Sequence, residues 1–365
     1  MKIESRIKDY NVEIIDGLLQ NKNVFFDGLH YGRLFYFIDE NFFQKHKKDL
    51  KEFIGSDFSC IIPALETNKS YFKLGDYYKV LIEASFRRND ILVTFGGGIL
   101  QDISGFISST LYRGIRWVFF PTTLLAQADS CIGSKTSINF DNYKNLIGTF
   151  YPPDRIFINP SFCRTLEPNY FNSGLGEIIK FHLMSDKAGY LRLKKYINSS
   201  ELHNENYLKE IILSTLEIKK SYFDADEFDT GRRNLLNYGH CFGHALESAT
   251  DFKVCHGEAV LAGMGFANLL SLKRRIMTQA VYDEFEQILQ RFYPCFNISS
   301  VNIDEIIKYM KRDKKRTGNE LTMILSEGIG KQFKFDNIKE AEIRDTYINF
   351  LSIYPKSNRR PVCVL

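Results

Sequence analysis

The sequence predicts an α/β N-terminal domain followed by a mainly α-helical C-terminal domain. Its 365 residues exceed what one hydrophobic core usually serves, so two domains are expected. Short apolar runs alternate with helical periods as far as residue 160, and long helical periods dominate after it. We therefore place the two domains at residues 1–160 and 161–365.

The N-terminal domain contains apolar runs that are typical of strands buried on both faces of a parallel sheet. Residues 34–38 and 91–95 are two such runs, and helical spacing extends over residues 71–87 between them. Residues 117–120 form a third run, which stops at a proline. This βαβ order predicts a parallel sheet that binds ligands at the carboxyl ends of its strands.

The second half of the chain shows few strand signals. Its apolar residues recur at helical spacing in five segments, which are residues 171–184, 206–222, 234–250, 257–275 and 278–292. A mainly α-helical C-terminal domain follows from this pattern.

The composition excludes several classes of protein. Hydrophobic residues make up 44% and charged residues 25%, as in ordinary soluble domains, and the net charge of +4 is spread along the chain, so no nucleic-acid partner is expected. The seven cysteines are scattered without a C-x-x-C pair, which argues against disulfides and a zinc ribbon. No apolar run approaches twenty residues, so no membrane partner is expected. We expect a cytoplasmic, reduced protein.

The segment FGGGILQDISGF at residues 95–106 indicates a phosphate-binding turn. Three glycines after a buried strand let the backbone approach a pyrophosphate, and the next helix N-terminus supplies amide donors. A plain tight turn is the competing interpretation, because the G-x-G-x-x-G pattern is absent. Asp39, at the end of an earlier strand, is placed where an acid could meet a ribose hydroxyl. Together these features favour nucleotide binding.

A second polar segment spans residues 121–150 and holds Asp129, Lys135, Lys144 and Asn145 among small residues and turn formers. Lysine and asparagine on glycine-containing loops suit a phosphorylated or carboxylated ligand. Solvated surface lysines are the competing interpretation, and the apolar neighbours of Lys144 weaken it for that residue.

Glu177 and Lys180 lie three residues apart on an otherwise apolar helical segment, GLGEIIKFHLM at residues 174–184. A surface ion pair would be exposed, whereas the flanking apolar residues predict burial. A buried carboxylate needs a partner such as a metal ion.

Three of the seven histidines fall within residues 240–256, which predicts a metal site. His240 and His244 are one helical turn apart, and His256 follows twelve residues after His244. From spacing alone, His240 and His244 are the preferred metal pair. No glutamate follows His240, so the H-E-x-x-H pattern of a protease is absent.

These residues stand in a longer ordered set of motifs that resembles the 3-dehydroquinate synthase family, one of the sugar phosphate cyclases. The match runs from about Asp39 to Lys315, and its motifs are GGGxxxDxxGF, RGxxxxxxPTTLLAQxDS, KNLIGxFYxP, GxxExIK, LNxGHxxGHxxE, HGExVxxGM and DKK. The resemblance implies a Rossmann-like N-terminal domain that binds NAD and a helical C-terminal domain that holds a divalent metal, zinc or cobalt.

The resemblance also implies roles for individual residues. It makes Glu177, His240 and His256 the metal ligands and moves His244 to the substrate. The implied NAD contacts are Asp39, Glu66, Lys69, Gly97, Gly98, Asp102, Thr122, Thr123, Asp129, Lys135, Lys144 and Thr165. The implied substrate and catalytic residues are Arg113, Lys135, Asn145, Lys180, Lys219, Arg233, Asn237, His244 and Lys315. The arginine that matches Arg113 can cross a dimer interface in this family, which implies a homodimer.

The implied reaction converts 3-deoxy-D-arabino-heptulosonate 7-phosphate to 3-dehydroquinate and phosphate in the shikimate pathway. It combines transient oxidation by NAD, β-elimination of phosphate, re-reduction and an intramolecular aldol cyclisation. The chain departs from the usual family pattern at Ser134, at Asn142-Tyr143 and at Asp229, which bears on the exact substrate.

Two alternatives remain open. One is a sibling cyclase that acts on sedoheptulose 7-phosphate or glucose 6-phosphate in secondary metabolism. Those substrates lack the carboxylate that Arg233 and Lys219 would bind, so both residues favour the acid substrate. The more distant alternative is a metal-dependent NAD alcohol dehydrogenase of the glycerol dehydrogenase type.

Overall fold

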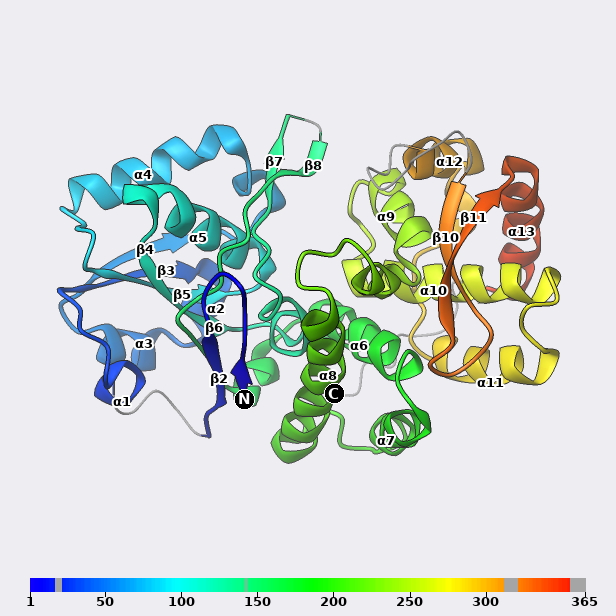
Figure 1. Cartoon of the computed structure of the whole chain (residues 1–365), viewed down its shortest axis with the longest axis horizontal. Helices are drawn as coiled ribbons and strands as arrows, with labels where there is room; N and C mark the ends of the chain where they lie inside the picture. The colour runs from blue at the N-terminus through cyan, green and yellow to red at the C-terminus, as the bar shows by residue number, and fades with distance from the viewer. Residues whose placement is uncertain (17–21, 142, 312–320, 355–365) are drawn as a thin grey trace. The chain divides into compact units, whose positions relative to one another are not determined.

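A computed structural model describes residues 1–16, 22–141, 143–311 and 321–354, and it divides the chain into two compact units (Figure 1). The first unit comprises residues 1–166 and the second residues 167–365. The change from one unit to the other thus comes six residues later than the position expected from the sequence.

The first unit is built on a seven-stranded sheet with the order β1-β2-β9-β6-β5-β3-β4. Among the described strands of this sheet, only β1 and β2 pair in an antiparallel way. The strands are β1 (Lys2–Ile3), β2 (Tyr10–Ile14), β3 (Leu34–Asp39), β4 (Phe58–Ile62), β5 (Ile91–Gly96), β6 (Arg116–Pro121) and β9 (Arg155–Ile158). The three strands predicted from apolar runs are β3, β5 and β6, and every residue of β3 and β5 is buried.

Helices cover both faces of this sheet (Figure 1). They are α1 (Lys22–Phe26), α2 (Glu40–Lys45), α3 (Lys47–Ile54), α4 (Leu74–Glu83) and α5 (Gly98–Thr110). The helix predicted over residues 71–87 is shorter, because a 3-10 turn at Tyr71–Lys73 precedes α4 and Ser85 has a left-handed φ of 60°.

The two faces of the sheet differ in what they pack against, because side chains alternate along a strand. Tyr36 and Ile38 join Phe95, Phe120 and Phe53 of α3 in one aromatic-rich core. A separate hairpin of β7 (Ile138–Phe140) and β8 (Tyr143–Ile147) carries part of the polar segment at residues 121–150.

The second unit is a helical assembly around α10 (His256–Lys273), whose residues from Ala259 to Ser271 are all buried. The other helices are α6 (Pro168–Leu183), α7 (Lys187–Ile197), α8 (Glu205–Ala225), α9 (His240–Ala249), α11 (Gln279–Leu289), α12 (Ile303–Lys311) and α13 (Glu340–Ile353). A helix that is apolar all round belongs at the centre of a domain, and α10 packs against α6, α9, α11 and α13.

Two features of this unit differ from the sequence-based expectation. The helix predicted over residues 234–250 is divided into a 3-10 turn at Arg232–Asn237 and α9, because Gly239 adopts a left-handed φ of 78° between them. The hairpin of β10 (Leu321–Ser326) and β11 (Gln332–Ile338) was not expected. Among the described residues, no helix is both long and apolar enough to span a bilayer.

Candidate functional site

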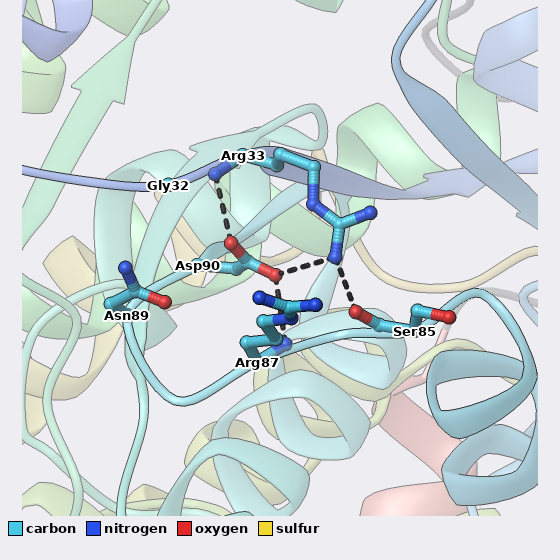
Figure 2. Close-up of a pocket in the computed structure, with 6 residues that line it drawn as sticks. All are labelled: Gly32, Arg33, Ser85, Arg87, Asn89 and Asp90. Carbon is cyan, nitrogen blue, oxygen red and sulfur yellow. Dashed lines mark hydrogen bonds and ion pairs between the residues drawn. The ribbon is translucent and has the colours of Figure 1, made fainter.

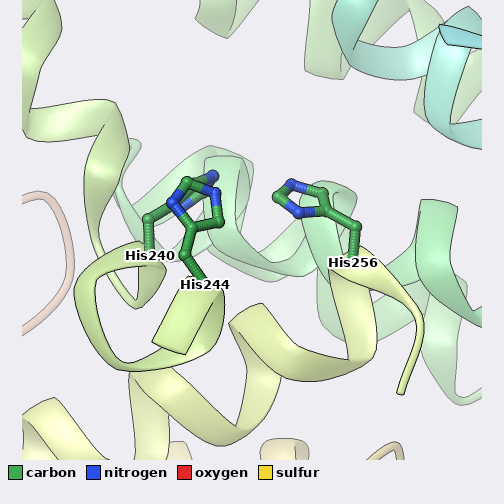
Figure 3. A group of neighbouring side chains, drawn as sticks. All are labelled: His240, His244 and His256. Atoms are coloured by element: carbon green, nitrogen blue, oxygen red, sulfur yellow. The ribbon is translucent and has the colours of Figure 1, made fainter. Parts of the chain in front are cut away.

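Four side chains from three helices of the second unit form a cluster with metal-ligand chemistry. Glu177 projects from α6. His240 and His244 project from α9, and His256 projects from the start of α10 (Figure 3). The Glu177 Oε1 atom lies 3.5 Å from His240 Nε2 and 3.3 Å from His256 Nε2. One nitrogen from each of the three histidines lies within 4.8 Å of the others.

Close helix crossings at glycine bring these residues together. A Cβ on Gly257 would lie 1.8 Å from the Ser173 carbonyl oxygen, and one on Gly176 would lie 2.2 Å from the Gly257 carbonyl oxygen. Between α9 and α10, a Cβ on Gly263 would lie 1.9 Å from the Gly239 carbonyl oxygen. Because Glu177, His240 and His256 each neighbour one of these glycines in sequence, the backbone contacts set the spacing of the cluster.

Burial and opposite charges act against each other within the cluster. Burial opposes the charge of Glu177, but Lys180 and His256 outweigh it and lower the Glu177 pKa to about 2. Burial, with Lys180 nearby, holds the pKa of His240 well below its usual value. Burial also opposes the charge of His256, but Glu247 and Glu177 raise its pKa to about 10. Opposite charges therefore favour an ionised Glu177 and a charged His256, whereas burial favours a neutral His240.

This donor set fits a borderline divalent cation. The Glu177 side chain has no solvent exposure, and neither of its oxygens makes a hydrogen bond of normal geometry. Its neighbours are the Lys180 ammonium, with which it forms an ion pair, and two imidazole nitrogens. A carboxylate oxygen with two imidazoles is a donor set that zinc and cobalt accept. The predicted burial of Glu177 and Lys180 is thus observed, with Lys180 only 2% exposed.

The second unit also buries cationic side chains. Lys219 on α8 and Arg233 are 6% and 5% exposed. The Arg233 guanidinium donates to the Glu227 carbonyl oxygen and lies 5.4 Å from the centre of the Phe223 ring. Buried cations of this kind are suited to binding an anionic ligand.

The loop that carries Arg233 is held by an aspartate. Asp226 accepts hydrogen bonds from the backbone N–H groups of Thr230, Gly231 and Arg233 at 3.0, 2.7 and 3.0 Å. Those bonds outweigh the effect of desolvation and lower the Asp226 pKa to about 2. Asn237 donates to the Asn234 carbonyl oxygen at 2.7 Å and closes the same segment.

In the first unit, the glycine-rich turn lies where the strand order reverses. The chain passes from β3 outward to β4 and then returns to β5 on the other side of β3. Ile38 pairs with Phe95, so Asp39 and Gly96 follow side by side at the carboxyl ends of these strands. Open parallel sheets bind nucleotides at such a switch point.

This turn has little room for a side chain at Gly97. A Cβ on Gly97 would lie 2.9 Å from Thr123 Cγ2, and the buried Thr122 donates its N–H to the Gly96 carbonyl oxygen at 2.9 Å. Helix α5 begins at Gly98, so the backbone N–H groups of its first turn lie at the glycine-rich turn. Asp39 accepts from the Phe42 N–H at 3.0 Å and caps α2.

Four further residues named as NAD contacts are linked to one another. Lys69 Nζ lies 2.7 Å from Asp102 Oδ2 and 3.9 Å from Glu66 Oε1, and Lys144 Nζ is 3.8 Å from the same Glu66 oxygen. Burial raises the pKa of Asp102 although Lys69 acts in the opposite direction. Asn139 was not predicted from the sequence. Its amide donates to Glu66 at 2.8 Å and accepts from the Asn145 N–H at 2.9 Å. No motif or charge distinguishes that asparagine in the sequence.

The remaining predicted residues are less closely grouped. Arg113, Lys135 and Asn145 are exposed, and Asp129 lies in a π-helical turn at Ala126–Ser130. The Thr165 hydroxyl lies 3.2 Å from His46 Nε2. Lys315 lies outside the described residues.

A separate pocket lies at the amino ends of β3 and β5, away from the switch point (Figure 2). Asp90 is 1% exposed and accepts from the Arg33 N–H at 2.9 Å and the Arg87 N–H at 2.8 Å. Its carboxylate also pairs with the Arg33 guanidinium at 3.2 Å. These contacts fix the starts of two strands, which is a structural role.

The sequences of both units match known proteins. Residues 59–173 match the model of the 3-dehydroquinate synthase N-terminal region, and residues 174–316 match that of its C-terminal region. The chain is 34% identical over 345 residues to 3-dehydroquinate synthase from Clostridium botulinum, covering 92% of this chain and 98% of that one.

Two solved structures share the fold. A 2-epi-5-epi-valiolone synthase from Streptomyces hygroscopicus with NAD+ and Zn2+ bound has a TM-score of 0.83 at 24% identity, covering 94% of this chain and 97% of that one. A 2-deoxy-scyllo-inosose synthase complexed with carbaglucose-6-phosphate, NAD+ and Co2+ has a TM-score of 0.83 at 21% identity, covering 94% and 98%.

Proposed function

Since the chain belongs to the 3-dehydroquinate synthase family, we propose that it converts 3-deoxy-D-arabino-heptulosonate 7-phosphate to 3-dehydroquinate and phosphate. The observation that carries the site assignment is the buried Glu177 carboxylate, which faces two imidazole nitrogens at 3.3 and 3.5 Å. This arrangement supports a metal-dependent reaction on a polar substrate.

The proposed cofactors are NAD and a divalent metal, zinc or cobalt. Glu177, His240 and His256 would hold the metal, and the turn at Gly97, Gly98 and Thr122 would hold NAD. When bound, these groups supply hydride exchange and Lewis-acid polarisation of substrate hydroxyls. The solved relatives that contain NAD+ with Zn2+ or Co2+ support this assignment.

The side chains of the second unit would bind and orient the substrate. Lys219 and Arg233 are buried cations, so their attraction to a carboxylate or phosphate is weakly screened by water. Lys180, paired with Glu177, would place a positive charge beside the metal ligands and stabilise negative charge that develops on the substrate. We also assign substrate contacts to Arg113, Lys135, Asn145, Asn237, His244 and Lys315.

Phosphate release tests the substrate. With the heptulosonate phosphate, NAD and zinc or cobalt, the full-length protein should release phosphate with no lasting NADH absorbance. Release from sedoheptulose 7-phosphate alone would contradict the acid substrate and favour a sibling cyclase. Lasting NADH in the presence of glycerol would favour the alcohol dehydrogenase alternative.

Paired histidine variants test the metal ligands. His256→Ala should lose the bound metal, whereas His244→Ala should retain it, because His244 is assigned to the substrate. Metal content measured by elemental analysis decides between the two sets. Loss in His244→Ala with retention in His256→Ala would contradict the assignment.

We further propose a cytoplasmic homodimer. Arg113 supports it, since its side chain is exposed and the arginine that matches it can cross a dimer interface in this family. Sedimentation analysis should give twice the mass of one chain. If Arg113 serves the partner's site, Arg113→Ala should lower turnover without changing metal content.

A further inference from the structure

We propose that Glu247 is a positioning residue that holds the Nδ1–H of His256 and so directs its Nε2 atom to the metal. This inference rests on the metal site of the proposed function and adds a residue to it. Glu247 itself would not touch the metal or the substrate.

The geometry distinguishes the two nitrogens of each imidazole. His256 Nδ1 lies 3.2 Å from Glu247 Oε2, and its Nε2 lies 3.3 Å from Glu177 Oε1. His240 is arranged in the same sense, with Nδ1 at 3.1 Å from the Tyr238 carbonyl oxygen and Nε2 at 3.5 Å from Glu177 Oε1. In both rings an oxygen acceptor faces Nδ1 and favours a proton there. Nε2 is then the nitrogen that binds the metal, and it releases its own proton where it carries one.

The two acceptors differ in charge, which gives the two histidines different properties. A carbonyl oxygen orients His240, whereas a carboxylate orients His256. An anionic acceptor makes the stronger hydrogen bond and increases the basicity of the ligating nitrogen. Metal affinity should therefore depend more on Glu247 than on an ordinary nearby carboxylate.

The fold explains why Glu247 can reach this ring. Glu247 lies two helical turns after His240, so both side chains are on one face of α9. The close approach of Gly243 to α10, where a Cβ would lie 2.9 Å from the Ala259 carbonyl oxygen, brings that face beside His256. The Glu247 side chain is 12% exposed, so water competes weakly for its charge.

If the Glu247–His256 contact were only a structural ion pair, its loss would have a different effect. Loss of such a pair would lower the stability of the fold but would leave zinc affinity unchanged once the protein is folded. The decisive readouts are therefore the metal dissociation constant and the state of the His256 ring.

The test uses the full-length protein, stripped of metal with a chelator and titrated with zinc in competition with an indicator. Glu247→Gln should weaken zinc binding by about 10- to 100-fold, the usual effect of losing such a carboxylate partner. Glu247→Asp keeps the charge but shortens the side chain, and it should also weaken binding. Circular dichroism verifies that each variant is folded.

Glu258→Gln is the matched control. It removes the same charge two residues from His256, but Glu258 interacts with Cys255 and Asn172 instead of the imidazole. Its zinc affinity should stay within about twofold of wild type. In 15N NMR spectra of the zinc form, the His256 Nδ1 proton should exchange with water faster in Glu247→Gln than in wild type or the control.

Equal zinc affinity in Glu247→Gln, Glu258→Gln and wild type would overturn the inference while leaving the metal site intact. Absence of zinc binding by the wild-type protein would overturn the proposed metal site and this inference together. The two failures are thus distinguishable in one titration series.

Discussion

In the second unit, burial changes how charged side chains interact with their neighbours. Glu177 and Lys180 would form an ordinary ion pair on an exposed helix, but with 0% and 2% side-chain exposure they become a constrained pair beside two imidazoles. The apolar residues around them predicted that burial from sequence. The approach of His240 and His256 to Glu177 could not be predicted in the same way, because these histidines are 63 and 79 residues away in the chain.

Glu286 provides a test of buried charge away from the cluster. Burial raises its pKa to about 7, although hydrogen bonds from Tyr293 and Gln290 act in the opposite direction. The folded-state pKa of Glu286 lies above the ordinary value of 4.5, so the folded state holds the proton more tightly than the unfolded state. The contribution of this proton to the free energy of unfolding is complete below pH 4.5 and is lost as pH rises through 7. The shift corresponds to roughly 3 kcal/mol.

The free energy of unfolding of the wild-type protein should therefore fall between pH 5.5 and 8.5, and that of Glu286→Gln should fall much less. Urea unfolding at both pH values measures the difference. In Asp283→Asn, on the exposed side of the same helix, the free energy of unfolding should change with pH as it does in the wild-type protein. An unchanged slope in Glu286→Gln would contradict the raised pKa.

At the level of elements, the sequence predicted helices and buried strands more accurately than their ends. The apolar runs of β3, β5 and β6 were identified because strands buried on both faces need continuous apolar residues. The division of residues 234–250 depends on the left-handed conformation of Gly239, and a helical apolar pattern does not report that conformation. The β10–β11 hairpin was missed among the helical signals that surround it.

The crossing of α6 and α10 leads to a prediction about these elements. Gly257→Ala would push a methyl group into the Ser173 carbonyl oxygen, so we expect a loss of about 1–3 kcal/mol from overpacking and weaker zinc binding. Thermal unfolding and zinc titration measure the two effects. The control is Gly75→Ala on α4, where a Cβ would meet no atom within 4 Å.

Gly75→Ala should leave stability and zinc affinity nearly unchanged, apart from a small gain in helix propensity. If Gly257→Ala behaved like Gly75→Ala, the spacing of the metal ligands would not depend on the close helix crossing.

At the level of the whole molecule, the chain consists of two units with separate cores and separate candidate chemistry. The first has a switch point in the strand order of a parallel sheet, and the second has a cluster of side chains with metal-ligand chemistry at helix crossings. A ligand that binds only the folded state raises stability by mass action. The metal should therefore stabilise the protein in proportion to the logarithm of its free concentration.

Zinc at about 100 times its dissociation constant should add about 2.7 kcal/mol to the free energy of unfolding. In differential scanning calorimetry, the unfolding temperature should rise steadily from the metal-free protein as zinc is added. His256→Ala should show no such rise. A rise of equal size in that variant would indicate zinc binding at another place.

The sequence by itself determined three buried strands, the main helical segments, the change from an α/β to a helical domain and the family to which the chain belongs. These properties depend on local periodicity and on ordered motifs, and both can be read along one chain. The tertiary structure decided the arrangement within the cluster, including the approach of Glu177 to His240 and His256 and the pairing of Glu247 with His256. Sequence spacing reports neighbours within one helix, whereas the contacts between α6, α9 and α10 depend on how closely their glycines allow the backbones to pack.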